Sequence, residues 1–327
     1  MKTFVKYFFG GLLFVAALAL PLTIGQGTIS WQDLFGRHTS MMQEIVWNIR
    51  LPRIIFAFLV GASLSLVGAA FQVLLRNELA TPYTLGISSG GALGAVIAIK
   101  TGLVIYVLGF SSSVVFSIAG SLLTVGIIFF IACERYEIST FTLLLAGVTI
   151  GLFFSAMILF IHYLADFTET YRMIRWLMGA LDVVGWRYPL AVLIIFIPVF
   201  IYLFLNASAF NLLLSGSEIA RSRGVDVRSL QKWSFIASSI LVGTCVSMAG
   251  PIGFIGLIVP HVVRLIFGPD HRKLFVLVIL LGGVFLVWAD TVARTIIAPA
   301  ELPVGIITSL IGGPFFIYLL VRNKVGR

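Results

Sequence analysis

The chain has 327 residues, of which 60% are hydrophobic and 11% are charged, and its formal net charge at pH 7 is +9. Soluble domains carry roughly 25% charged residues, so this composition excludes a soluble globular protein and indicates a polytopic α-helical membrane protein. The basic residues do not gather into a patch with interleaved aromatic residues, so the positive charge is not typical of nucleic-acid binding.

Ten apolar stretches approach or exceed the length of about 20 residues that crosses a hydrocarbon core of roughly 30 Å. The expected spans are residues 4–24, 53–75, 84–100, 108–132, 139–164, 186–206, 232–249, 253–268, 274–293 and 303–321. The first resembles a signal peptide, but an uncleaved first helix is the simpler interpretation in a chain with so many later spans. We expect a single transmembrane domain, residues 1–327.

Basic residues between the spans set the expected orientation. With the N-terminus inside, most of the 22 Lys and Arg residues lie in cytoplasmic segments, in accordance with the positive-inside rule. An even number of spans then places both termini in the cytoplasm, together with the loop between the sixth and seventh spans.

That loop, residues 206–232, is a polar stretch between two apolar spans. Ser215 and Ser217 could cap a short helix at its start, and Gly224 could end it. A short polar helix held between two spans suits a membrane protein that is gripped by a soluble partner. A merely solvated loop is the alternative.

Two segments interrupt the helical pattern at membrane depth. Small residues in the stretch 82–94 allow helices to approach closely, and this stretch lacks the pattern of a phosphate-binding loop. Between the seventh and eighth spans, Gly250 and Pro251 stop a helix. Irregular backbone at this depth needs burial or water, so we expect a helical bundle with an interior cavity, as in a transporter. The alternative is the ordinary enrichment of Pro and Gly in membrane helices.

Few ionisable residues lie deep inside the expected spans. His162 and Asp290 are near span ends, and Lys100 can extend its ammonium group to the interface. An ion-coupled carrier would be expected to keep carboxylates or histidines near the midplane. No enzymatic motif is recognisable, and Cys133 and Cys245 are expected to be buried thiols. We therefore expect no catalytic residue, metal site or cofactor on this chain, and an energy source on another chain.

Four longer stretches carry a family signature. They are RLPRIIFAFLVGASLSLVGAAFQVLLRNELATPYTLGISSGGALGA (50–95), LLLSGSEIARSRGVDV (212–227), AGPIGFIGLIVPHVVRLIFGPDHRKL (249–274) and ADTVARTIIAPAELPVGIITSLIGGPFF (289–316). In order and spacing they resemble the permease family of ABC importers for iron-siderophores, haem and vitamin B12. The resemblance runs through nearly the whole chain.

The resemblance implies an all-α, ten-helix type II importer permease in the cell membrane of a bacterium. Its expected partners are a second permease subunit, identical or paralogous, two cytoplasmic ATPase subunits that hold ATP and magnesium, and an external substrate-binding protein. A ferric siderophore is the expected substrate, with vitamin B12 or haem as alternatives. An ion-coupled secondary transporter is a less favoured alternative.

The resemblance also implies roles for particular residues. The loop around residues 212–230 would form coupling helices in a cleft of the ATPase, with pattern positions Gly216, Glu218, Ala220, Arg221 and Gly224. Acidic residues of the binding protein would dock on Arg50, Arg53 and Arg294, because a guanidinium holds a carboxylate through two hydrogen bonds. Arginines at the lipid interface are the alternative. The helix break at Gly250, Pro251 and Gly253 would lie near the outer face and shape the translocation path.

Overall fold

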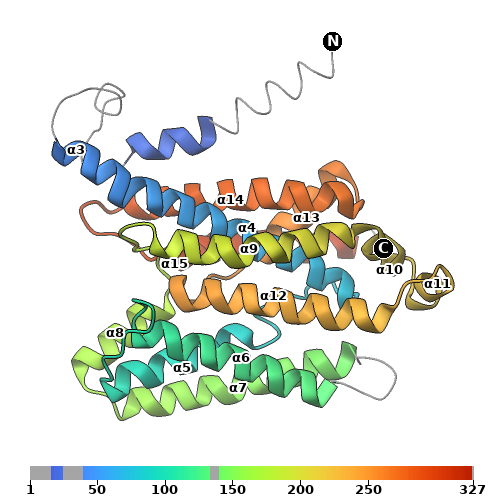
Figure 1. Ribbon diagram of the computed structural model, residues 1–327, viewed down its shortest axis with the longest axis horizontal. Helices are drawn as coiled ribbons and strands as arrows, with labels where there is room; N and C mark the ends of the chain where they lie inside the picture. The colour runs from blue at the N-terminus through green and yellow to red at the C-terminus, as the bar shows by residue number, and fades with distance from the viewer. Residues whose placement is uncertain (1–15, 25–39, 133–139, 326–327) are drawn as a thin grey trace.

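The computed structural model describes residues 16–24, 40–132 and 140–325, and this part of the chain is almost entirely helical (Figure 1). A short helix at residues 16–23 precedes the labelled elements. These are α3 (Ser40–Ile45), the π-helical turn η1 (Val46–Arg50), α4 (Leu51–Leu74), α5 (Ile87–Thr101), α6 (Ser112–Ala132), α7 (Thr140–Tyr163), α8 (Phe167–Leu177), α9 (Arg187–Leu205), α10 (Ala207–Leu214), α11 (Ser217–Ser222), α12 (Val227–Ala249), α13 (Ile255–Phe267), α14 (His271–Thr295) and α15 (Val304–Val325).

Nine of the ten expected spans correspond to helices in the described ranges, which confirms the all-α polytopic fold class. Among the described residues, six helical segments are long and apolar enough to cross a membrane, and α5, α13 and α15 contribute shorter apolar segments. The first expected span, 4–24, lies mostly outside the described residues, as does Cys133. Cys245 is a buried free thiol in α12, as expected.

Two helices begin earlier than the hydropathy pattern predicts, because an aspartate caps each of them. Asp226 accepts the backbone N–H of Ser229, so α12 begins at Val227 rather than at residue 232. Asp270 accepts the N–H of Arg272, so α14 begins at His271 rather than at residue 274. Capping satisfies first-turn N–H groups that have no partner inside the helix.

Helix α4 forms the centre of the bundle and packs against α14, α13, α9 and α12. Its span is 89% buried, against 17% for α7 and 28% for α9. Small residues make this possible, because Gly68 of α4 lies directly against Gly256 of α13, where a Cβ atom would collide with backbone. Close backbone approach of this kind is how membrane helices gain packing energy without a hydrophobic driving force.

A second group, α5, α6 and α7, packs alongside the first, and α12 lies between the two groups (Figure 1). The expectation that small residues after residue 82 allow close helix approach is confirmed. A Cβ atom on Gly90 of α5 would lie 2.7 Å from the carbonyl oxygen of Gly120 in α6. The helices therefore form one continuous core across both groups.

Helix α8 was not predicted from the hydropathy pattern, which placed only a connection between residues 164 and 186. It is short and amphipathic, and a capping box fixes its start, since Asp166 accepts the N–H of Glu169 while Glu169 accepts the N–H of Asp166. Lys100 of α5 donates to Glu169 at 2.7 Å and to the Leu164 carbonyl at 2.8 Å. The hydrogen bond from Lys100 to Glu169 is the main reason that the pKa of Glu169 is lowered.

The molecule thus has two chemically different ends. Figure 1 shows α10 and α11 at one end, named here the α11 end, and α8 with α3 at the other, named the α8 end. Helices α4 and α14 run side by side between them, and each carries charged residues near the α8 end.

Candidate functional site

The loop between α9 and α12 folds into two short helices at the α11 end. Helix α11 is preceded by Gly216, with φ +131°, and followed by Gly224, with φ +84°, both in the left-handed region that favours glycine. The prediction that Gly224 ends the helix is confirmed, since its N–H donates to the Arg221 carbonyl at 2.9 Å. The prediction of a serine cap is wrong, because Gly216 occupies that position and no side chain caps α11.

The side chains of α11 divide into an inner and an outer face. Ala220 is fully buried, and its carbonyl accepts the N–H of Val225 at 3.0 Å, which closes the turn. Glu218 and Arg221 are exposed. Helix α11 therefore packs on the molecule through a small buried residue and exposes two charged side chains together with Ile219.

A cavity of about 760 Å³ opens beside the break between α12 and α13. Its walls come from the loop before α5, the end of α8, the break itself and α15. The lining residues are Leu79, Thr81, Tyr83, Thr84, Leu177, Met178, Pro251, Gly253, Phe254, Leu257, Gly305, Ile306, Ser309, Leu310 and Phe316. None of them is charged, so the cavity offers aromatic rings, aliphatic groups and hydroxyls.

The three residues predicted at the break have different surroundings. Pro251 and Gly253 line the cavity, and a Cβ atom on Gly253 would meet nothing within 4 Å. Gly250 has φ +68°, and a Cβ atom there would lie 2.5 Å from the Trp176 carbonyl oxygen. Gly250 therefore serves the close packing of the break against the end of α8, whereas Gly253 keeps the cavity open.

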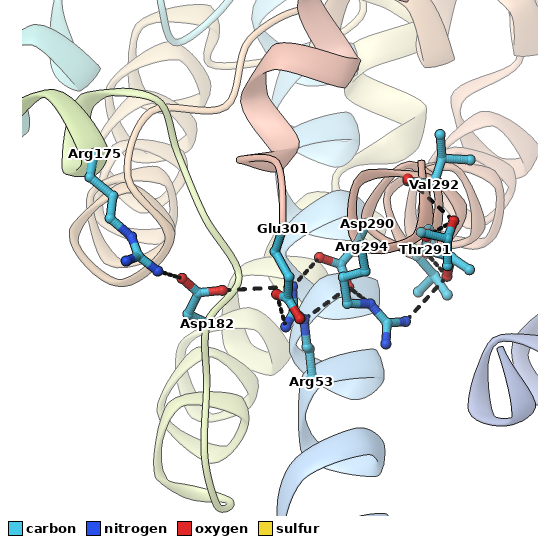
Figure 2. A network of polar contacts seen from close by, with 10 residues as sticks. Arg53, Arg175, Asp182, Asp290, Thr291, Val292, Arg294 and Glu301 are labelled. Atoms are coloured by element: carbon cyan, nitrogen blue, oxygen red, sulfur yellow. Dashed lines mark hydrogen bonds and ion pairs between the residues drawn. The ribbon is translucent and has the colours of Figure 1, made fainter. Parts of the chain in front are cut away.

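A network of ion pairs occupies the α8 end (Figure 2). Arg53 of α4 holds Asp290 of α14 through two hydrogen bonds of 3.0 and 3.1 Å, and it donates to Glu301 at 2.9 Å. Arg294 approaches the same Asp290 carboxylate at 3.1 Å. Asp182 lies 3.7 Å from Arg53 and pairs with Arg175 of α8 at 3.0 Å. The network thus ties α4, α14 and the two loops at this end together.

Burial is uneven across this network. The side chains of Asp290, Arg294 and Arg53 are only 3%, 8% and 12% exposed, whereas those of Asp182 and Glu301 are 45% and 37% exposed. Buried ions need partners because desolvation is costly. Three arginines face three carboxylates, Arg53, Arg175 and Arg294 against Asp182, Asp290 and Glu301, so the formal charges balance.

The sequence comparisons identify the family. The FecCD transport family matches residues 12–322. The chain belongs to that family. It is 43% identical over 303 residues to the ABC transporter permease YvrB of Bacillus subtilis, a match that covers 91% of this chain and 86% of that protein. It is 38% identical to the hemin transport permease HmuU of Yersinia pestis, with 97% and 96% covered.

Two further comparisons agree. The vitamin B12 import permease BtuC of Vibrio cholerae is 36% identical, with 95% of this chain and 92% of that protein covered. A solved structure of a metal-chelate type ABC transporter in an inward-facing conformation matches with a TM-score of 0.86 and 30% identity over 97% of this chain and 99% of that chain. This FecCD protein is therefore an ABC importer permease with the type II fold.

For a FecCD permease, the predicted docking arginines have unexpected surroundings. Arg53 and Arg294 meet around Asp290, whereas Arg50 donates to the Leu22 carbonyl at 2.7 Å. Arg50 and Arg294 are buried, and the side chain of Arg53 is only 12% exposed, so none of the three is displayed on a rim. Their role in docking stays a prediction, and the structure adds that any incoming carboxylate must compete with internal ones.

Sequence reasoning missed Asp182 and Glu301 as members of this network. Their spacing carries no motif, because Glu301 is 248 residues from Arg53 along the chain. Asp290 was noted only for its place near a span end. One local signal pointed to the network: Asp290 and Arg294 are four residues apart, which places them on one face of α14.

Proposed function

We propose that this chain forms one half of the translocation path for a ferric siderophore. The cavity beside the α12–α13 break carries the proposal, because its volume of about 760 Å³ suits a bulky organic chelate. A ferric siderophore presents its metal already wrapped in organic ligands, so a path for it needs no metal-binding side chains. The uncharged lining, with Tyr83, Phe254 and Phe316 among its aromatic members, fits that requirement.

Vitamin B12 or haem is the second candidate, because relatives named for these substrates cover most of this chain. Both are also large and carry an enclosed metal. An ion-coupled secondary transporter is disfavoured, because the buried carboxylate of Asp290 is committed to Arg53 and Arg294 and does not line the cavity.

The proposed assembly contains a second permease subunit, two ATPase subunits that bind ATP and magnesium, and an external binding protein. In this arrangement α11 contacts the ATPase, both termini are cytoplasmic, and Arg50, Arg53 and Arg294 face the binding protein in the cell membrane of a bacterium. The arrangement of α11 supports the first of these contacts, because its charged side chains are exposed and its backbone is held by internal hydrogen bonds.

Uptake of labelled compounds tests the substrate. Cells with and without this chain would be given ferric hydroxamates, ferric catecholates, haem and cobalamin, each at the same concentration. We expect chain-dependent uptake of one class of ferric siderophore. Uptake of cobalamin or haem alone would reject the siderophore proposal while leaving the importer function intact.

The role of the cavity can be tested by filling it. Gly253→Leu places a large side chain in the open cavity, and it should reduce uptake about tenfold or more while leaving folding unchanged, because no neighbour lies within 4 Å of the new Cβ. Gly126→Leu in α6 is the matched control, since that position is also open and lies outside the cavity lining. Equal uptake by the two variants would contradict a translocation path through this cavity.

A further inference from the structure

One asparagine of α10 is hydrogen-bonded to the N-terminus of α14. Asn211 of α10 donates through Nδ2 to Asp270 Oδ1 at 2.8 Å. Its Oδ1 accepts the backbone N–H of His271 at 2.8 Å and faces His271 Nδ1 at 2.9 Å. A side chain from one helix therefore caps the first turn of another, where N–H groups have no partner within the helix.

The chemistry of this contact requires an asparagine amide in one orientation. Reversing the amide would set its NH₂ group against the N–H of His271 and its oxygen against the Asp270 carboxylate. The carbonyl oxygen is the shared acceptor, so Nδ1 of His271 carries the proton. The hydrogen bond from Asn211 is also the main reason that the pKa of Asp270 is lowered.

The histidine side of this contact is buried. His271 is fully buried and lies between Phe210 of α10, at a ring distance of 5.9 Å, and Phe275 of α14, at 5.3 Å. One turn away, Arg272 donates to Ser208 of α10 at 2.8 Å. Helix α10 is therefore held to α14 by polar and aromatic contacts on a single face.

The same helix α10 leads directly into α11. Ser215 and Gly216 donate to the carbonyls of Leu212 and Leu213 at 3.1 Å each, so the end of α10 stays hydrogen-bonded up to the start of α11. At its far end, α14 carries Asp290 and Arg294 of the ion-pair network. A continuous helix thus joins the α11 end to the α8 end (Figure 1).

We propose that Asn211 is a positioning residue that transmits movement of α11 to α14 and hence to the α8 end. This proposal rests on the proposed importer function. The covalent connection through Asp226 leads to α12. Without Asn211, α10 would keep its Ser208–Arg272 hydrogen bond and the ring contacts of Phe210 with α14, but it would lose the contact that fixes it to the first backbone N–H of that helix. A fixed hydrogen-bonded contact between two stiff helices moves them together, as coupling between distant sites requires.

The contact itself is tested on the chain alone in lipid nanodiscs, with no partner present. Asn211→Ala should speed hydrogen exchange of the His271 amide about tenfold, because that N–H loses its acceptor, while the Arg272 amide keeps its bond to Asp270. The matched control is Asn206→Ala at the junction of α9 and α10, whose side chain donates to the Tyr202 carbonyl of α9 and not to α14. Equal exchange in the two variants would overturn the role of Asn211 as a cap.

Transmission is tested in vesicles with the ATPase and binding protein. Asn211→Ala should lower uptake per ATP hydrolysed about fivefold or more, with basal hydrolysis close to that of Asn206→Ala. Its thermal stability should be somewhat lower than that of the control, because two donors of His271 lose their acceptor. The double exchange Asn211→Asp/Asp270→Asn restores one donor facing one carboxylate and should recover coupling, whereas Asn211→Asp alone should not. Wild-type coupling in Asn211→Ala, or a loss that only parallels lowered stability, would overturn the proposal. Absence of ATP-driven uptake by the wild-type chain would instead reject the importer function itself, and with it the transmission role, while the exchange result still reports on the cap.

Discussion

Charged residues at the two ends of this permease have opposite surroundings. At the α11 end, Glu218 and Arg221 are exposed on the short helix α11, and Arg228 is exposed in the first turn of α12. At the α8 end, Arg53, Asp290 and Arg294 are almost fully buried and face one another. Exposed charges contribute little to stability and can serve recognition, whereas removal of one buried ion leaves its partner without compensation. The two ends should therefore respond differently to the same kind of substitution.

The largest expected effect comes from Asp290→Ala. It would leave Arg53 and Arg294 buried beside a missing carboxylate, at a cost of about 3–5 kcal/mol of folding free energy. Thermal unfolding of the purified chain in detergent measures this loss. The matched control is Asp182→Ala at the exposed edge of the same network, where about 0–1 kcal/mol is expected. Equal losses would show that burial does not distinguish these carboxylates.

At the α11 end, Gly224→Pro should abolish coupling with little loss of the membrane-embedded fold. Proline cannot adopt φ +84° and removes the N–H that donates to Arg221, so the end of α11 must rearrange. The expected result is retained ATP hydrolysis with uptake reduced about tenfold or more, measured in reconstituted vesicles. Glu218→Lys, which changes only an exposed charge, should act in the same direction and more weakly. Normal transport in both would remove the coupling role from α11.

Docking at the α8 end is best tested at Glu301. Reversing Arg53 to Glu would place another carboxylate beside Asp290 and destabilise the network, so slower docking would have two explanations. Glu301→Gln instead removes the exposed internal competitor for Arg53, and docking of the binding protein should be up to about tenfold faster. The gain should shrink as salt rises, since screening limits exposed charges to about 10 Å at 0.1 M. If neither Glu301→Gln nor added salt changes the docking rate, these arginines have a structural role alone.

The smallest difference between the ends is expected in their response to pH. The pKa of Glu169 is lowered mainly by the hydrogen bond from Lys100, and that of Asp270 mainly by the one from Asn211. A lowered folded-state pKa gives stability that is present above the unfolded value of about 4 and lost as pH falls through the folded value. Thermal stability should be flat from about pH 8 to 5 as far as these groups contribute, and should fall below about pH 4. Glu169→Gln should remove the part of this acid-induced loss of thermal stability that comes from the α8 end. Asp270→Asn should remove the part that comes from the α11 end. A fall near pH 6 would point to a different titrating group.

Local signals along the chain accounted for much of the helical framework. Apolar length placed α4 to α7, α9 and α12 to α15 to within a few residues, because a membrane span is set by the thickness of the hydrocarbon core. The position of Gly224 predicted the end of α11 correctly, because the ability of glycine to adopt a positive φ is a local property. Helix α8 escaped the hydropathy pattern because it is too polar for a span, although Asp166 and Glu169 stand at the spacing of a capping box.

Composition and residues close together in the chain were sufficient to predict four features. These are the class of the protein, its described spans, the position of the polar loop and its family. Which charges compensate one another, and which residues face the cavity, became clear from the folded bundle. Arg53 and Asp290 are 237 residues apart, and Asn211 and His271 are 60 apart. Such pairs meet only after helices pack through their small residues, and neither member carries a local signal for the other. A buried charge or polar group is costly without a partner, so such pairs are needed only where the folded bundle buries them.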